Sequence, residues 1–310
     1  MRSCVQPPKS RRLRAVALGI AGLLVYACDR SPTSTETAAE VSAKVAQVAA
    51  AVTGQDAPMA DEAEAGRHLG FDTYTYPGDA KMRAWKNAPN APYEWVGFYL
   101  PSGPCYKGTS WAGKRQTLTD MGWGIAVVYV GQQTWNRRIR TLTPAQLAAQ
   151  RRRGATCNAD FLGAGRGMEE GLDAIRKTEA EGFPKGTVVF LDIERTERMP
   201  EQMRDYYTAW VATVLKDGRY RPGIYVHSHN ALQVYNDVKQ LFLAAGVKEE
   251  PRFWVASARD FSPDKAPQDV GHEFAGMWQG VIDVVRRIAD VALPIDINVS
   301  SWPSPSDVVD

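Results

Sequence analysis

From residue 68 onward, short apolar runs alternate with segments of helical periodicity. We expect eight of these runs to be strands, at residues 68–73, 95–100, 124–130, 187–193, 223–227, 253–258, 274–279 and 294–299. Most are continuously apolar rather than alternating, which is typical of parallel strands covered on both faces. The pattern therefore predicts a sheet whose strands are buried on both sides.

Helical periodicity fills several of the intervals between these runs. It predicts helices over residues 167–182, 200–217 and 230–245, with Asn230 as the N-cap of the third. Tyr206 and Trp210 lie at helical spacing in the second and are expected in the core. Residues 163–167 are glycine-rich but follow no strand, so we expect a loop there.

This order of elements predicts an α/β fold, a (β/α)8 TIM-type barrel over residues 68–302. The intervals after the sixth and seventh strands are short, which indicates irregular late βα units. An open doubly wound sheet is the alternative. No Gly-x-Gly-x-x-Gly opens a helix after the first strand, so the barrel is favoured.

The first 28 residues have the pattern of an export signal. Basic residues precede an apolar stretch of 13 residues at 15–27, and a bilayer span needs ~20. The stretch ends Leu24-Val25-Tyr26-Ala27-Cys28, which resembles the bacterial lipobox, so we expect Cys28 to carry lipid. The alternatives are an ordinary secretory peptide cut near Ala27 and an uncleaved anchor. Residues 29–67 read as a spacer with one short amphipathic helix, and residues 303–310 as a C-terminal tail.

Charge and cysteine content narrow the function classes. The net charge is +2, from 37 basic and 35 acidic residues, so nothing favours a nucleic-acid partner. Outside the signal only Cys105 and Cys157 remain, both in loop contexts, and an exported protein is expected to join such a pair in a disulfide. Two free buried thiols are the alternative. No Cys-x-x-Cys suggests a structural zinc, and no cofactor is expected.

Acidic residues stand at three of the predicted strand ends. Asp192 and Glu194 are spaced two apart at the end of the fourth run, so both side chains lie on one face. Neighbouring acids that repel and desolvate each other have raised pKa values, as a general acid needs. Asp72 ends the first run and Asp296 lies in the eighth. In a barrel these ends meet at one mouth, although each acid could instead cap a helix or form a structural ion pair.

Glycosidic bond cleavage requires this combination of groups. A protonated carboxyl releases the leaving oxygen while a second anion or nucleophile stabilises the developing positive charge. The remaining strand ends supply aromatic and amide side chains suited to a sugar, which we expect to contact substrate: Tyr74, Tyr99, Tyr129, Tyr225, His227, Trp278, Gln279 and Asn298. For the tyrosines, packing is the alternative role.

The pair His227 and His229 suggests a different chemistry. Two histidines two apart at a strand end could share a metal ion with Asp296, as in a metal-dependent hydrolase. Histidine ligands are scarce elsewhere in the chain, so a histidine that contacts substrate is the favoured interpretation, and no metal is expected.

The strand-end motifs resemble those of known glycoside hydrolases. Gly70-Phe71-Asp72, Asp192-Ile193-Glu194, Trp278-Gln279 and Asp296-Ile297-Asn298 are similar in order to family 25, the muramidase lysozymes. Together with Thr73-Tyr74, Gly97-Phe98-Tyr99-Leu100 and Pro222-Gly223-Ile224-Tyr225, they resemble the glycoside-hydrolase-like family called domain of unknown function 1906. The resemblance implies that Glu194 is the general acid, with Asp192 beside it and Asp72 and Asp296 flanking the sugar. It also implies action on the bond after N-acetylmuramic acid in peptidoglycan.

The sequence therefore predicts an exported, lipid-anchored barrel that binds or cleaves cell-envelope glycan, with peptidoglycan as the favoured polymer. Its partners would be this glycan and, through the lipid, a membrane. The protein would face the periplasm or the cell exterior. A barrel lipoprotein that binds glycan without cleaving it is the main alternative, and a metal-dependent hydrolase is the lesser one.

Overall fold

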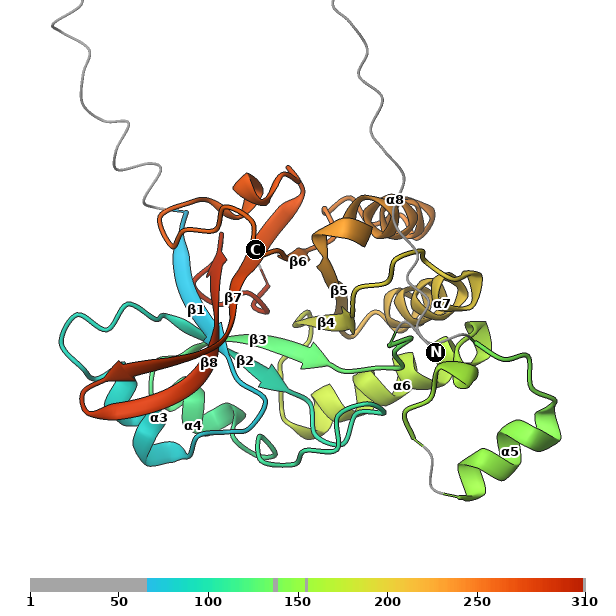
Figure 1. Cartoon of the computed structure of the whole chain (residues 1–310), viewed down its shortest axis with the longest axis horizontal. Helices are drawn as coiled ribbons and strands as arrows, with labels where there is room; N and C mark the ends of the chain where they lie inside the picture. The colour runs from blue at the N-terminus through green and yellow to red at the C-terminus, as the bar shows by residue number, and fades with distance from the viewer. Residues whose placement is uncertain (1–65, 136–138, 154–155, 309–310) are drawn as a thin grey trace, which may run out of the picture. The chain divides into compact units, whose positions relative to one another are not determined.

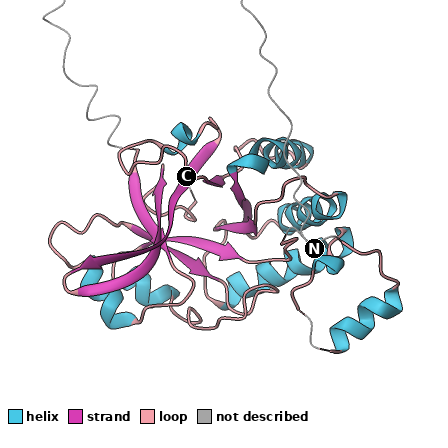
Figure 2. Cartoon of the chain, in the orientation of Figure 1, coloured by secondary structure: helices cyan, strands magenta, loops and turns pink. Residues whose placement is uncertain are grey.

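A computed structural model describes residues 66–135, 139–153 and 156–308 (Figures 1 and 2). The expected signal, the expected lipidation site Cys28 and nearly all of the expected spacer lie outside these residues. Eight strands close into a barrel in chain order, which confirms the predicted fold. They are β1 (His68–Asp72), β2 (Trp95–Tyr99), β3 (Gly124–Tyr129), β4 (Val188–Ile193), β5 (Arg221–His227), β6 (Phe253–Ala256), β7 (Ala275–Ile288) and β8 (Val291–Ser300).

Helices connect the first six strands. They are α3 (Asp79–Lys86), α4 (Arg115–Asp120), α5 (Pro144–Arg152), α6 (Ala164–Ala180), α7 (Glu201–Asp217) and α8 (Ser228–Ala244), with short 3-10 turns η1 (Ala159–Phe161) and η2 (Pro267–Val270). As predicted, Tyr206 and Trp210 of α7 are buried. None of the helices in the described ranges is long and apolar enough to cross a membrane.

The last two strands depart from the repeating pattern, as the short intervals predicted. Strands β1 to β7 run parallel, whereas β8 is antiparallel to both β7 and β1. A parallel crossover needs a dozen or more residues, but only Ala289 and Asp290 join β7 to β8, both at positive φ, in a tight hairpin (Figure 1). The reversed β8 places Asp296 directly opposite Asp72 at the strand-end mouth.

Two local predictions were wrong. Residues 163–167 are not a loop, because α6 begins at Ala164. Gly167 lies so close to α7 that a Cβ there would be 2.1 Å from the carbonyl oxygen of Tyr206. Asn230 is not an N-cap. Instead, the side chain of His227 accepts the capping N–H of His229, and the buried Asn230 accepts the backbone N–H of Thr196.

Aromatic rings fill the barrel interior beneath the mouth. Trp254 of β6 packs edge-on against Trp95 and Phe190, with ring centroids 5.6 and 5.9 Å apart. On the side of the mouth, the ring of Trp254 packs edge-on against the ring of Tyr225, with centroids 5.3 Å apart. Because Trp254, Trp95 and Phe190 are buried and closely packed, Trp254 forms a rigid floor for the space above it.

The segment after β8 closes the opposite end of the barrel. Ser306 is buried there; its Oγ accepts the N–H of Val127, and its main chain bonds to Ile125 and Val188. Residues 303–308 are thus integral to the barrel rather than a loose tail. Gly124, at the start of β3, lies so close that a Cβ would meet the carbonyl oxygen of Pro303 at 1.9 Å.

This contact predicts that Gly124→Ala destabilises the barrel, since Pro303 must move to admit a methyl group. Overpacking of this kind costs about 1–3 kcal/mol, a fall in Tm of roughly 2–10 °C for a domain of this size. Gly165→Ala is the matched control, because its Cβ would meet nothing within 4 Å. Thermal unfolding of both variants provides the test. Equal Tm values for Gly124→Ala and the control would contradict this packing.

Candidate functional site

A small cavity of about 80 Å³ lies at the end of the barrel where the parallel strands finish. Four carboxyl groups line it: Asp72 at the end of β1, Asp192 and Glu194 at the end of β4, and Asp296 from the middle of β8. The rest of the lining is Tyr99, Val128, Tyr225, Trp254 and Gln279. The structure thus brings together all four predicted acids and three of the eight predicted substrate contacts.

Asp72 is held by three hydrogen bonds. Its Oδ1 accepts the hydroxyl of Tyr99 at 2.6 Å, and its Oδ2 accepts the side-chain amides of Asn298 and Gln279 at 2.9 and 3.0 Å. Burial raises the pKa of Asp72, while these three donors partly offset the shift by favouring the charged form. Gly97 makes room for this carboxyl group, because a Cβ there would lie 2.6 Å from the Cβ of Asp72.

Gln279 connects two of the acids. Its amide nitrogen donates to Asp72 and, at 3.2 Å, to Asp296, while its oxygen accepts the hydroxyl of Tyr225 at 2.6 Å. A bulge in β7 turns the backbone N–H of Asp283 onto Asp296, at 2.7 Å. Burial and then the charge of Asp72 raise the pKa of Asp296 to about 7.

Asp192 and Glu194 point into the cavity side by side, as their spacing predicted. Asp192 is buried, and its Oδ1 has no hydrogen-bond partner among the described residues. Burial, followed by the charges of Glu194 and Asp72, raises the pKa of Asp192 well above its usual range. Glu194 is more open, and burial is again the main cause of its raised pKa. Since all four pKa values are raised, the cavity retains protons at pH values where isolated carboxyl groups have lost them.

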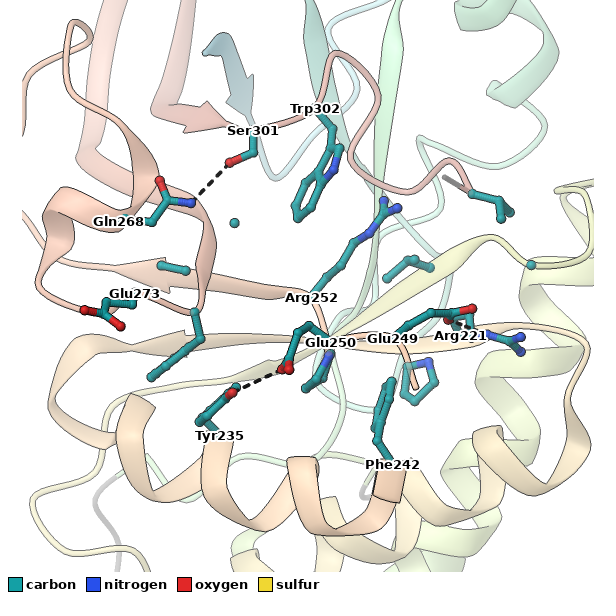
Figure 3. Close-up of a pocket in the computed structure, with 18 residues that line it drawn as sticks. Arg221, Tyr235, Phe242, Glu249, Glu250, Arg252, Gln268, Glu273, Ser301 and Trp302 are labelled. Carbon is teal, nitrogen blue, oxygen red and sulfur yellow. Dashed lines mark hydrogen bonds and ion pairs between the residues drawn. The ribbon is translucent and has the colours of Figure 1, made fainter. Parts of the chain in front are cut away.

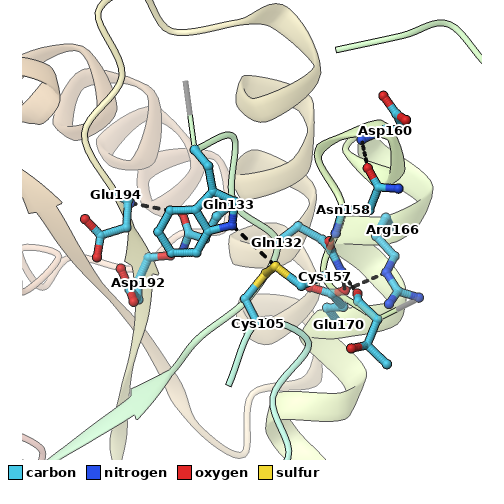
Figure 4. The surroundings of a disulfide bond; sticks show 12 residues. Cys105, Gln132, Gln133, Cys157, Asn158, Asp160, Arg166, Glu170, Asp192 and Glu194 are labelled. Carbon is cyan, nitrogen blue, oxygen red and sulfur yellow. Dashed lines mark hydrogen bonds and ion pairs between the residues drawn. A yellow bond between two sulfur atoms is a disulfide. The ribbon is translucent and has the colours of Figure 1, made fainter. Parts of the chain in front are cut away.

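Gln133, just beyond β3, fixes the position of the acid pair. This fully buried side chain donates its amide N–H to the carbonyl of Asp192 at 2.8 Å and accepts the N–H of Glu194 at 3.1 Å (Figure 4). Sequence reasoning missed it, although it falls in the segment after β3 where a barrel collects site residues. Trp254, the floor of the cavity, was missed as well.

The neighbouring Gln132 holds the disulfide loop. Cys105 and Cys157 are joined, as expected of an exported pair. The side chain of Gln132 bonds to the carbonyl of Thr156 and the N–H of Asn158, on either side of Cys157 (Figure 4). Consecutive glutamines therefore anchor the disulfide loop and the end of β4.

Two predicted contacts lie outside the cavity. The hydroxyl of Tyr129 donates to Asp173 of α6, and the indole N–H of Trp278 donates to the carbonyl of Ser257. Both side chains are completely buried. Strand alternation explains the error, because the adjacent Val128 and Gln279 occupy the inward positions.

The other three predicted contacts lie around the cavity. Asn298 is buried behind Asp72, and its oxygen accepts the indole N–H of Trp254 at 3.0 Å. Tyr74 is 58% exposed and lines an open cleft of about 580 Å³ that shares Asp72, Tyr99 and Asp296 with the cavity. His227 is absent from the lining of both.

The histidine pair offers no support for a metal. His229 bonds through Nε2 to the carbonyl of Glu197, and the Nδ1 of His227 accepts the backbone N–H of His229. Across the described part of the chain, no three His, Cys, Asp or Glu side chains are grouped so that they could hold a metal ion.

The raised pKa of Asp296 predicts a pH-dependent stability. A carboxyl whose folded pKa rises from 3.8 to about 7 stabilises the fold most below pH 3.8, and this contribution disappears as the pH rises through 7. Asp296→Asn should therefore flatten the fall in Tm between about pH 4 and 8. The exposed Asp205→Asn should keep the wild-type slope. Identical slopes in all three proteins would contradict the raised pKa of Asp296.

Several solved structures are similar to this chain. In fold the chain is similar to an uncharacterised B. stearothermophilus protein, at 17% identity and a TM-score of 0.47, over 75% of this chain and 95% of that one. It is also similar to a muramidase from Acremonium alcalophilum, at 16% identity and a TM-score of 0.42, over 74% of this chain and 92% of that one. A third similar structure is the family GH25 lysozyme from Aspergillus fumigatus, at 12% identity and a TM-score of 0.42, over 76% of this chain and 93% of that one.

The sequence comparisons are more specific about the family. No match emerges among curated proteins. The family model described as Rv2525c-like, glycoside hydrolase-like domain matches residues 83–299, which include Asp192, Glu194 and Asp296. The chain therefore belongs to the Rv2525c-like, glycoside hydrolase-like domain family.

Proposed function

We propose that this protein is an exported glycoside hydrolase that acts on a cell-envelope glycan, with peptidoglycan as the favoured polymer. The observation that carries the proposal is the closure of four carboxyl groups around one cavity, each with a raised pKa. Glycosidic cleavage needs a carboxyl that is protonated near neutral pH beside another that is not. When neighbouring carboxyl groups desolvate and repel one another, some of them keep their protons while others ionise.

Glu194 is the proposed general acid. It is the more open member of the β4 pair, and Gln133 fixes its backbone. Its proton passes to the departing glycosidic oxygen as the bond from that oxygen to the anomeric carbon breaks. Water then adds its oxygen to this carbon, and its proton returns to the Glu194 carboxylate. Asp192 would orient Glu194 or stabilise the positive charge that develops on the sugar.

The glycan itself would occupy the open cleft rather than the cavity. A space of about 80 Å³ admits only water or one small substituent, whereas the cleft offers about 580 Å³. The exposed ring of Tyr74 is available to stack on a sugar face. Asp72 and Asp296 line both spaces, so a sugar in the cleft would contact the carboxyl cluster through them.

A glycan-binding protein without catalysis is the second candidate, and one observation favours it. Glu194 lines the cavity but not the cleft, so a glycan confined to the cleft would not contact it. In that case the cleft would bind the polymer while the acids maintain the shape of the mouth.

We place the protein at the membrane, facing the periplasm or the cell exterior. The support is the lipobox-like sequence that ends at Cys28, behind a basic segment and an apolar stretch. The disulfide between Cys105 and Cys157 agrees with an oxidising compartment. A lipid on Cys28, followed by the spacer, would tether the barrel within reach of the cell wall.

Purified insoluble peptidoglycan distinguishes the two candidates. Glu194→Gln should lower the release of reducing ends at least ~100-fold, as expected when a general acid is lost, and should still sediment with the polymer. Glu197→Gln, a change at an exposed neighbour, should match the wild type. Equal release by wild type and Glu194→Gln would contradict the assigned acid. Sedimentation without release by any of the three proteins would favour the binding protein.

A further inference from the structure

A second, larger cavity lies at the opposite end of the barrel from the acids. It has a volume of about 660 Å³ and opens where β4 to β7 begin, beside the chain that follows β8 (Figure 3). Four aromatic side chains form much of its wall: Tyr235, Phe242, Phe274 and Trp302. A volume of roughly 300–1,000 Å³ with mainly apolar walls and a few polar groups is typical of small-molecule sites.

Arg252 is the distinctive polar group of this cavity. Its guanidinium lies 4.4 Å from the ring centroid of Trp302, and its Nη1 donates to the carbonyl of Pro305 at 2.6 Å. No carboxylate in the described ranges lies within ion-pair distance of it. Arg252 is half-buried, and this burial lowers the pKa of its guanidinium, while the charges of Asp307 and Glu249 partly offset the shift. A desolvated guanidinium with one hydrogen bond retains several N–H donors for an acceptor.

Most other charges around the cavity are paired. Arg221 bonds to Glu249 at 3.3 Å, and Glu250 is bound by Lys239 and by the hydroxyl of Tyr235. Glu273 is exposed, so water solvates its charge. Arg252 is therefore the lining cation with no carboxylate of the described residues within ion-pair distance; the charges of Asp307 and Glu249 act on it from farther away, and the cavity provides space for a closer anion.

The packing around Trp302 holds the guanidinium in place. Gly276 of β7 lies directly against the ring, and a Cβ there would meet it at 2.2 Å. With Trp302 fixed on the strand and Pro305 bound to one nitrogen, the planar donor fork has little freedom. Such a fork matches carboxylate and phosphate oxygens, which accept two parallel N–H bonds. Anchoring Pro305 alone would need only one N–H donor and no desolvated charge.

We propose that this cavity binds a small ligand in which a carboxylate or phosphate group is attached to an apolar ring. The oxyanion pairs with Arg252, and the ring packs against the aromatic walls formed by Tyr235 and Phe274. This site is independent of the acid cavity and of the proposed glycosidase activity, since the two lie at opposite ends of the barrel.

The full chain can be titrated with phenyl phosphate and with benzoate while the indole N–H signal of Trp302 is followed by NMR. The expected result is a saturable shift of this signal with at least one of them, and the tighter ligand identifies the preferred oxyanion. Inorganic phosphate, which lacks the ring, and benzyl alcohol, which lacks the charge, should bind at least about tenfold more weakly. If neither aromatic anion moves the Trp302 signal, the proposal is wrong.

Two arginines of the same cavity supply a matched pair of variants. Arg252→Gln should weaken binding about tenfold or more, because the ligand loses a charge-assisted bidentate partner. Arg221→Gln should bind as the wild type does, since Glu249 already neutralises Arg221. Arg252→Lys keeps the charge but loses the fork, so it should bind more weakly than the wild type, and it decides the question if Arg252→Gln fails to fold. Wild-type affinity in the folded Arg252 variants would overturn the proposal.

Discussion

Burying four carboxyl groups around one small cavity is the constraint that shapes this protein. Each charge removed from water is costly by several kcal/mol unless hydrogen bonds or protons compensate for it. Asp72 is compensated by two amides and one hydroxyl, and Asp296 by one amide and one backbone N–H. Asp192 has an oxygen with no partner among the described residues, and it also has a pKa raised well above the usual range. Protonation therefore provides the compensation that donors do not.

The surrounding structure serves to hold these groups at short range. Gln279 connects Asp72, Asp296 and Tyr225, so strands β1, β5, β7 and β8 are linked through one amide. Gln133 connects β3 to the end of β4 in the same way. Buried amides suit this task because each can donate and accept without adding a charge. The reversal of β8 contributes too, since it sets Asp296 opposite Asp72.

The fold and the acids could be predicted from the sequence because both follow from periodicity. Apolar runs defined the strands, and a spacing of two placed Asp192 and Glu194 on one face. Periodicity does not say which of two adjacent residues at a strand end faces the barrel interior. Tyr129 and Trp278, both expected to contact substrate, therefore turn out to bond to Asp173 and Ser257 outside the cavity.

Long-range contacts explain the other failures. Gln133 acts through main-chain atoms some 60 positions away, and nothing in its own segment indicates this partner. The direction of β8 depends on a tight two-residue connection, Ala289-Asp290, whose residue types do not by themselves mark a hairpin. Asparagine is common at helix N-caps, but the N-cap of α8 is His227, three residues before Asn230. The side chain of Asn230 instead accepts the backbone N–H of Thr196.

The central claim is that the carboxyl cluster retains protons near neutral pH. Carbon-13 NMR of the Asp and Glu carboxyl carbons, recorded from about pH 3 to pH 9, measures this directly. The account predicts that Asp296 titrates at about pH 7 and that Asp192 changes protonation far above the usual range, with the cluster titrating as a coupled group. If the four carboxyl groups all titrated between about pH 3 and pH 5, like isolated side chains, the account would be contradicted.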